Sequence, residues 1–163
     1  MSVVYLSLGS NLERKIHNLN QAVLEIGLNV GNVIHVSSFY HSKPCGFKSE
    51  NDFVNAVAIV ETELTPLELL HMLNKVEKKI GRKSKTEKHY SDRIIDIDIL
   101  FYDNLTINLP QLKIPHVELH KRDFVLVPLM EVAPDLKHPV LKKTISMLYR
   151  AHENKTPVFP VKR

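Results

Sequence analysis

The 163-residue sequence predicts an α+β fold, a ferredoxin-like βαββαβ sandwich with helical additions at the C-terminal end. Short runs of apolar and β-branched residues, closed by turn-forming residues, indicate strands. Apolar residues at helical spacing indicate helices between these strands. The resulting order of strand, helix, strand, strand, helix, strand is the split βαβ pattern, in which two helices cover one face of a sheet.

The first predicted elements are a strand and a helix. Residues 3–8 form a short apolar run that ends at turn-forming residues, which indicates a buried strand. From Leu12 to about Leu28 the apolar residues recur at helical spacing, so we predict a helix there. Gly27 or Gly31 ends this helix, because glycine is common at helix C-termini.

Two more strands follow, joined by a loop. Residues 33–40 are rich in β-branched and aromatic side chains and predict the second strand. Residues 42–51 contain proline, glycine and small polar residues, which is typical of a loop. Residues 53–63 alternate in part between apolar and polar and predict a third strand, which we expect to form a hairpin with the second.

The second helix has the clearest start signal in the chain. Thr65 can cap the exposed backbone donors, Pro66 suits the first helical position, and Glu68 completes a capping box. Apolar residues then line one face until Gly81 ends the helix. Residues 82–93 are polar and basic, and too irregular to form a core element.

The remaining chain predicts one more strand and a helical tail. Residues 94–102 have the strongest strand pattern, and residues 103–104 form a turn. A proline-containing stretch spans residues 110–116, and helices are predicted near residues 122–132 and 144–151.

The composition is that of an ordinary globular protein, with 44% apolar and 25% charged residues. A net charge of +4 is small for a polybasic nucleic-acid binder, and no apolar run approaches the about 18 residues of a membrane span. Cys45 is the only cysteine, so no intrachain disulfide can form, and a secretory signal is not apparent at the N-terminus. We expect a single domain over residues 1–163, monomeric and cytoplasmic, with no nucleic-acid or membrane partner.

Two acidic residues on the last predicted strand carry the strongest chemical signal. Side chains two apart in a strand point to the same face, so Asp96 and Asp98 should project together while Ile97 points the other way. Neighbouring carboxylates in an apolar strand are costly unless a cation lies between them. Magnesium binds such oxygens together with substrate phosphates. The alternative is an edge strand whose aspartates simply face water.

A basic segment directly before this strand favours the metal interpretation. Cations and metal ions together form the clamp that phosphoryl transfer needs, although such a loop alone could be a solvated tether. No P-loop or G-x-G-x-x-G motif is present, and the lone cysteine does not support a His-Cys metal site. The cations of the segment are Arg82, Lys83, Lys85, Lys88 and Arg93.

Short motifs follow one another along nearly the whole chain, each weak alone but specific in order and spacing. They are Leu8-Gly9-Ser10-Asn11, residues 36–40, residues 42–46, residues 53–56, Glu77 with Gly81-Arg82, residues 93–100, residues 114–116, residues 122–126, Pro128-Leu129 and Ala133-Pro134. In this order they resemble the 6-hydroxymethyl-7,8-dihydropterin pyrophosphokinase family. The resemblance implies transfer of the pyrophosphoryl group of ATP to the hydroxymethyl oxygen of the dihydropterin, with release of AMP, in folate synthesis.

The resemblance also implies where ATP and metal ions bind. Asp96 and Asp98 would hold two Mg²⁺ ions on the triphosphate of the co-substrate ATP. Arg82 and Arg93, with Lys85, would hold phosphate oxygens and take part in catalysis. The implied nucleotide-binding positions are Asn74, Ile99, Leu112, Lys113, His116 and Arg122. Glu77 would support the site residues without contacting a substrate.

A second group of residues is implied to form the pterin pocket: Ser42, Pro44, Cys45, Gly46, Phe53, Asn55, Tyr90 and Phe124. Asn55 would bind the polar edge of the ring, and Phe53 and Phe124 would stack on its faces. Taken singly, the two phenylalanines fit a core role equally well, and a backbone partner could also explain Asn55. The chain departs from the family pattern where Tyr90 replaces a tryptophan, where a lysine replaces a second loop arginine, and at Val117, where tyrosine is frequent.

Two other classes compete with this interpretation. RNA-binding modules share the βαββαβ order, but they need exposed aromatic residues in a pattern that this sequence lacks. A regulatory domain would bind a small molecule without consuming ATP, so release of AMP separates it from an enzyme. The sequence leaves the general base open.

Overall fold

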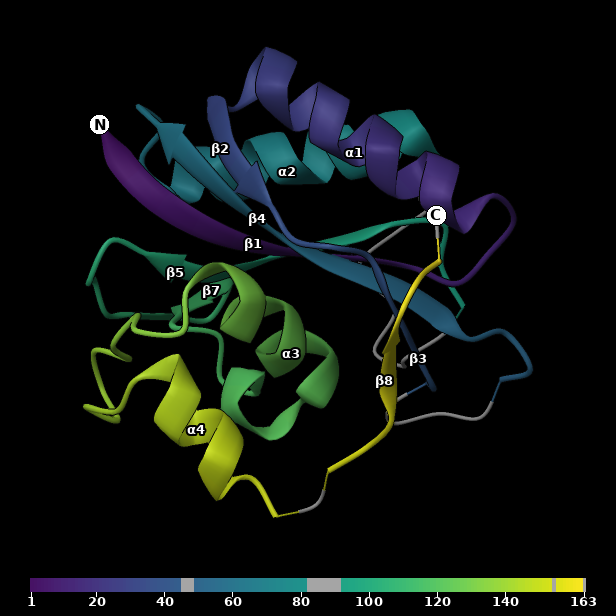
Figure 1. The fold of residues 1–163 in the computed structure, drawn as a ribbon. Helices are drawn as coiled ribbons and strands as arrows, with labels where there is room; N and C mark the ends of the chain where they lie inside the picture. The colour runs from purple at the N-terminus through teal and green to yellow at the C-terminus, as the bar shows by residue number, and fades with distance from the viewer. Residues whose placement is uncertain (45–48, 82–91, 154, 163) are drawn as a thin grey trace.

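The computed structural model describes residues 1–44, 49–81, 92–153 and 155–162, and its centre is an antiparallel sheet (Figure 1). The strands lie in the order β5-β1-β4-β3-β8, and β2 also pairs with β4. A separate hairpin, β6-β7, follows β5. The bounds of the strands are β1 (Ser2–Ser10), β2 (Asn32–Val36), β3 (Tyr40–Ser42), β4 (Phe53–Thr62), β5 (Asp96–Tyr102), β6 (Ile107–Leu109), β7 (Leu112–Ile114) and β8 (Val158–Pro160).

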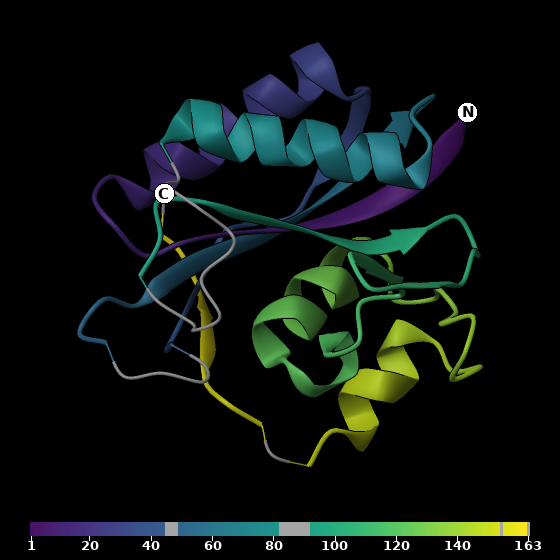
Figure 2. The ribbon, with the colours of Figure 1, turned by 180° about the vertical axis from the view of Figure 1, so that it is seen from behind.

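Helices cover both faces of the sheet (Figures 1 and 2). α1 and α2 pack on one face, and α3 and α4 lie on the other. The sequence predicted helices on one face only, so the C-terminal helices supply a second layer. The helices in the described residues are α1 (Lys15–Asn29), α2 (Pro66–Ile80), the short 3-10 helix η1 (Leu119–Lys121), α3 (Asp123–Val132) and α4 (Ile145–Ala151). Helices packed on an antiparallel sheet confirm the predicted mixed α and β composition.

Each face of the sheet has its own apolar core, because side chains alternate along a strand. Leu6 and Leu8 of β1 are buried in the core beneath α1 and α2. Phe101 of β5 belongs to the opposite core, together with Leu126 and Leu129 of α3. The central strands therefore hold α3 against the sheet, and the first turn of α3 is fixed relative to β1, β4 and β5.

The start of α2 is as predicted, whereas the start of α1 is not. The hydroxyl of Thr65 accepts from the backbone N–H of Glu68, and the Glu68 carboxylate accepts from the N–H of Thr65, which completes the capping box. α1 begins at Lys15 rather than near Leu12. Glu13 has a φ of 56°, which a helical residue cannot adopt, so the helix cannot start earlier.

The predicted strand at residues 33–40 is two strands, β2 and β3, separated by residues 37–39. Both pair with β4, which confirms the expected hairpin. The interruption has a physical cause, since side chains take over the backbone hydrogen bonds there. The Ser37 hydroxyl accepts from the N–H of Val57, and the Glu131 carboxylate accepts from the N–H of Ser38.

The elements predicted in the C-terminal half are present with small shifts at their ends. The strand expected over residues 94–102 begins at Asp96, and the two tail helices begin one residue after their predicted starts. The hairpin β6-β7 was not predicted as strands. In the described part of the chain, no helix combines the length and the apolar character needed to cross a membrane.

Candidate active site

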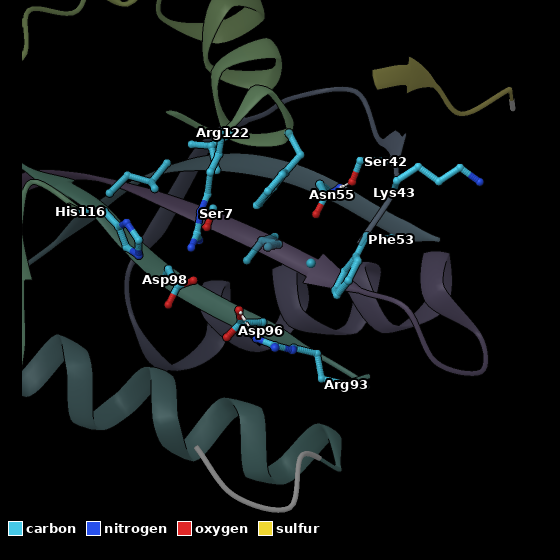
Figure 3. Close-up of a pocket in the computed structure, with 15 residues that line it drawn as sticks. Ser7, Ser42, Lys43, Phe53, Asn55, Arg93, Asp96, Asp98, His116 and Arg122 are labelled. Carbon is cyan, nitrogen blue, oxygen red and sulfur yellow. Dashed lines mark hydrogen bonds and ion pairs between the residues drawn. The ribbon is translucent and has the colours of Figure 1, made fainter. Parts of the chain in front are cut away.

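A pocket lies on the α3 side of the sheet, where β1, β4 and β5 meet the start of α3 (Figure 3). Strand register organises its floor. Gly9 of β1 pairs with Asn55 of β4 on one side and with Asp96 of β5 on the other. The pocket therefore has an acidic end and an amide end separated by a glycine. Its lining consists of Ser7, Leu8, Gly9, Ser42, Lys43, Phe53, Asn55, Arg93, Asp96, Asp98, Leu100, His116, Arg122, Phe124 and Val125.

The acidic end is formed by Asp96 and Asp98, which both line the pocket from β5. Both side chains are half-buried, whereas Ile97 between them is buried in the core beneath α1 and α2. This alternation confirms that the two carboxylates share one face of the strand. β5 is an edge strand, as the alternative assumed, but its two aspartates line the pocket.

The donor set at the acidic end fits magnesium. Two carboxylates on one strand face offer hard oxygen ligands, which Mg²⁺ prefers. Among residues 1–44, 49–81, 92–153 and 155–162, no three His, Cys, Asp or Glu side chains are grouped so that they could hold a metal ion. Magnesium tolerates this sparse set because it usually keeps water and substrate phosphate as ligands.

Arg93 lies beside the acids and is held there by Asn11. Its guanidinium is 3.0 Å from Asp96 Oδ2, and the two side chains are only 13% and 20% exposed. The Arg93 N–H donates to Asn11 Oδ1 at 2.7 Å, and the Asn11 N–H donates to the Arg93 carbonyl at 3.1 Å. Asn11 also donates to Asp92, whose pKa is lowered by hydrogen bonds from Ser49, Asn11 and other neighbours. The backbone at Arg93 is therefore fixed before any ligand arrives.

The amide end is formed by Asn55, which is only 5% exposed. Its Nδ2 donates to the Ser42 hydroxyl at 2.6 Å, so its partner is a side chain of β3 rather than the backbone. A Cβ atom at Gly9 would lie 3.1 Å from Asn55 Oδ1. The missing side chain at Gly9 thus leaves room for the amide. Phe53 and Phe124 line the same pocket and supply apolar walls.

His116 and Arg122 line the wall between the acids and α3 (Figure 3). Burial lowers the pKa of His116, and the negative charge of Asp98 opposes this shift. His116 Nδ1 accepts from the N–H of Glu118 at 3.2 Å, which fixes the ring orientation. The Arg122 guanidinium lies 5.7 Å from the centre of the Phe124 ring. A cation and an aromatic wall therefore meet at the start of α3.

Several predicted site residues do not line the pocket. Glu77 is buried on α2 and accepts from the N–H of Ile97 at 3.1 Å, so it supports the strand that carries the acids. Asn74 also lies on α2, and its Oδ1 is buried without a hydrogen-bond partner among the described residues. The others outside the lining are Pro44, Ile99, Leu112 and Lys113. The predictions for Cys45, Gly46, Arg82, Lys85 and Tyr90 lie outside the described residues.

The sequence of the chain matches a known protein family. A family described as 7,8-dihydro-6-hydroxymethylpterin-pyrophosphokinase matches residues 5–134. The chain belongs to this family. Membership confirms the resemblance identified in the sequence and the pyrophosphokinase function that it implied, and it does not support the RNA-binding and regulatory alternatives.

Individual pyrophosphokinases are similar over most of their length. The chain is 44% identical over 140 residues to the 2-amino-4-hydroxy-6-hydroxymethyldihydropteridine pyrophosphokinase of Haemophilus influenzae, covering 85% of this chain and 86% of the relative. It is 44% identical over 142 residues to the Porphyromonas gingivalis protein of the same name, covering 85% and 95%.

Solved structures show the same fold. A structure of Plasmodium falciparum HPPK-DHPS superposes with a TM-score of 0.76 at 22% identity and covers 91% of this chain. This chain spans 44% of the length of that larger protein.

Six residues that line the pocket were not predicted as site residues: Ser7, Leu8, Gly9, Lys43, Leu100 and Val125. Leu100 could have been found, because it continues the alternation of Asp96 and Asp98 along β5. Ser7 and Gly9 enter the pocket only through the pairing of β1 with β5, in which Ser7 lies opposite Asp98. The register between β1 and β5 cannot be predicted from the sequence of either strand alone.

Proposed function

We propose that this pocket transfers the pyrophosphoryl group of ATP to the hydroxymethyl oxygen of 6-hydroxymethyl-7,8-dihydropterin, giving AMP and the pterin diphosphate for folate synthesis. The observation that carries the proposal is that one pocket has two ends of different chemistry. Carboxylates and arginines gather at one end, and an amide and two phenylalanines gather at the other. Membership of the pyrophosphokinase family supports the same reaction.

The triphosphate is assigned to the acidic end. Asp96 and Asp98 would hold two Mg²⁺ ions, which when bound neutralise phosphate charge. Arg93 and Arg122 present guanidinium groups from opposite sides of the pocket and would bind phosphate oxygens (Figure 3). His116 lies at the same end and would contact the nucleotide.

The pterin is assigned to the amide end. Asn55 Oδ1 and the Ser42 hydroxyl can bind the donors and acceptors along the ring edge, while Phe53 and Phe124 pack against the ring faces. Because Gly9 lies directly between Asn55 and Asp96, the two substrates would meet above it. Holding both reactants in one orientation accounts for much of the rate that such a site can supply.

Other parts of the sequence prediction remain proposals. The order β5-β1-β4-β2 of the main strands supports the ferredoxin-like description of the core. The single domain, the monomeric state and the cytoplasmic location stay predictions.

The proposed reaction is tested by incubating the protein with hydroxymethyl-dihydropterin, ATP and Mg²⁺. We expect AMP and the pterin diphosphate in equal amounts. Formation of ADP, or hydrolysis of ATP that does not depend on the pterin, would contradict the proposal.

The acidic pair is tested by Asp96→Asn and Asp98→Asn. We expect each change to lower turnover about a hundredfold or more, because the site loses charge that a phosphate-bound cation needs. Steady-state release of AMP measures the loss, and circular dichroism checks the fold. Glu61→Gln is a matched control, since it neutralises a carboxylate on β4 of the same sheet that does not line the pocket. Near-normal rates in both aspartate variants would remove the metal assignment.

A further inference from the structure

Asp123 is a buried carboxylate that the proposed chemistry does not use. It is the first residue of α3 and lies between two pocket residues, Arg122 and Phe124, but it does not line the pocket itself. Its exposure is 2%. A carboxylate at this depth requires partners, because burying an unpaired charge is costly.

The partners of Asp123 come from the C-terminal segment of the chain. Oδ2 accepts from the backbone N–H of Thr156 at 2.5 Å, and the Thr156 hydroxyl lies 3.5 Å from the same oxygen. Oδ1 lies 3.7 Å from Nε2 of His152, a residue that is 14% exposed and directly follows α4. One carboxylate therefore joins the first turn of α3 to the chain that leaves α4.

The same C-terminal segment continues into β8, which pairs with β3 (Figure 1). In this pairing Val158 lies opposite Ser42, and the N–H of Val161 donates to the carbonyl of Phe39 at 2.8 Å. Ser42 is the residue that holds the Asn55 amide. The segment that Asp123 fixes thus reaches the strand at the amide end of the pocket.

A second contact joins α3 to the strand region at its far end. The Glu131 carboxylate accepts from the N–H of Ser38 and from the Tyr40 hydroxyl. This contact lies two helical turns away from Phe124. Glu131 therefore fixes the end of the helix away from the pocket, and Asp123 fixes the end that carries Phe124, which lines the same pocket as Ser42 and Asn55.

We propose that Asp123 is a positioning residue for the pterin. Its carboxylate holds the C-terminal segment against the first turn of α3, and so sets the spacing between the Phe124 wall and the Ser42–Asn55 wall. The inference rests on the proposed assignment of the pterin to these walls. Loss of the carboxylate leaves the Thr156 N–H without its acceptor and loosens both walls, so pterin binding weakens more than nucleotide binding, which also depends on Asp96, Asp98 and Arg93 away from α3.

The test compares Asp123→Ala with Asp123→Asn and with the control Asp135→Ala, which removes an exposed carboxylate after α3. Pterin binding is measured by equilibrium titration in the presence of a non-hydrolysable ATP analogue. For Asp123→Ala we expect the Kd for pterin to rise about tenfold, with less than about a twofold change in the Kd for the analogue. Asp123→Asn keeps an oxygen that can accept from Thr156, so it should recover most of the pterin affinity.

A second readout is independent of any ligand. Amide hydrogen exchange over residues 155–162 should become faster in Asp123→Ala and stay as in the unaltered protein in Asp135→Ala. If Asp123→Ala does not fold, Thr156→Pro removes the backbone donor together with the nearby hydroxyl and should give the same two changes, whereas Thr156→Val removes only the hydroxyl and should give neither. A proportional loss of pterin and analogue affinity, or unchanged exchange in residues 155–162, overturns the positioning role.

The outcome separates this inference from the proposed function. Phe124→Ala tests the pterin assignment itself, because it removes a wall rather than the residue that places it. Weak pterin binding in Phe124→Ala together with normal binding in Asp123→Ala rejects only the positioning role. Normal binding in Phe124→Ala rejects the assignment on which it rests.

Discussion

At the scale of single residues, Gly9 shows how an absent side chain shapes the site. Its backbone lies between Asp96 and Asn55, and the nearest atom to an added Cβ would be Asn55 Oδ1. The glycine is needed for space rather than for an unusual φ, because its φ is not in the positive region. A single methyl group placed here would press on the amide that we assign to the pterin.

Gly9→Ala should therefore weaken pterin binding more than ATP binding. The added Cβ would lie 3.1 Å from Asn55 Oδ1 and 3.7 Å from Phe53 Cδ1, so the amide must shift and its hydrogen bond to Ser42 weakens. We expect the Kd for pterin to rise about fivefold, measured by titration. Gly27→Ala is the control, because its Cβ meets Val33 in ordinary contact at 3.9 Å on an exposed part of α1. That change should stabilise the protein by about 0.5–1 kcal/mol.

At the scale of elements, the Glu131 carboxylate of α3 links this helix to the first residue of β3 and to the residues just before that strand. Glu131 accepts from the N–H of Ser38 and from the hydroxyl of Tyr40. Burial raises the pKa of Glu131, but the hydrogen bonds from Tyr40 and Ser38 outweigh it, so the pKa lies below its usual 4.5. Burial and the bond to Glu131 also raise the pKa of Tyr40 to about 12.

The lowered pKa of Glu131 gives a stability effect with a definite sign. A carboxyl group whose pKa is lower in the folded state stabilises the fold above its unfolded pKa, and this contribution is lost as pH falls through the folded pKa. Glu131→Gln should therefore lower the midpoint of thermal unfolding at about pH 7 and have a smaller effect at about pH 3. Unfolding scans across this range measure the difference, and an equal loss at both pH values would contradict the pKa shift.

At the scale of the whole molecule, the pocket lies where the sheet and the α3 layer meet. The acids belong to β5, whereas Arg122 and Phe124 belong to the start of α3. β5 contributes side chains to both cores, whereas α3 packs only in the core that it shares with α4. A ligand that bridges the pocket therefore connects the two layers.

ATP with Mg²⁺ should raise the midpoint of thermal unfolding, because a ligand that binds only the folded state stabilises it. At about a hundredfold above its Kd the gain is about 2.7 kcal/mol, or several degrees for a domain of this size. Asp98→Asn should lose most of the increase, while Glu61→Gln should keep it. An equal increase in both variants would show that the nucleotide binds elsewhere.

The sequence predicted features that depend on neighbours in the chain. The alternation around Asp96 and Asp98 and the capping box of Thr65 are local patterns, and both are confirmed. The break between β2 and β3 was missed because its cause, Glu131, lies 93 residues away from Ser38. The role of Gly9 as a pocket residue depends on strand register, which no single segment contains.

The edge of the sheet at β5 has a consequence for association between chains. An exposed edge strand invites pairing with a second molecule, and charged side chains are a common defence. Here the N–H of Ile97 donates to Glu77, and the carbonyl of Leu100 accepts from the N–H of His116. Intramolecular partners therefore block strand addition at these two points. Replacing the aspartates of β5 should consequently change the chemistry without making the protein prone to aggregate.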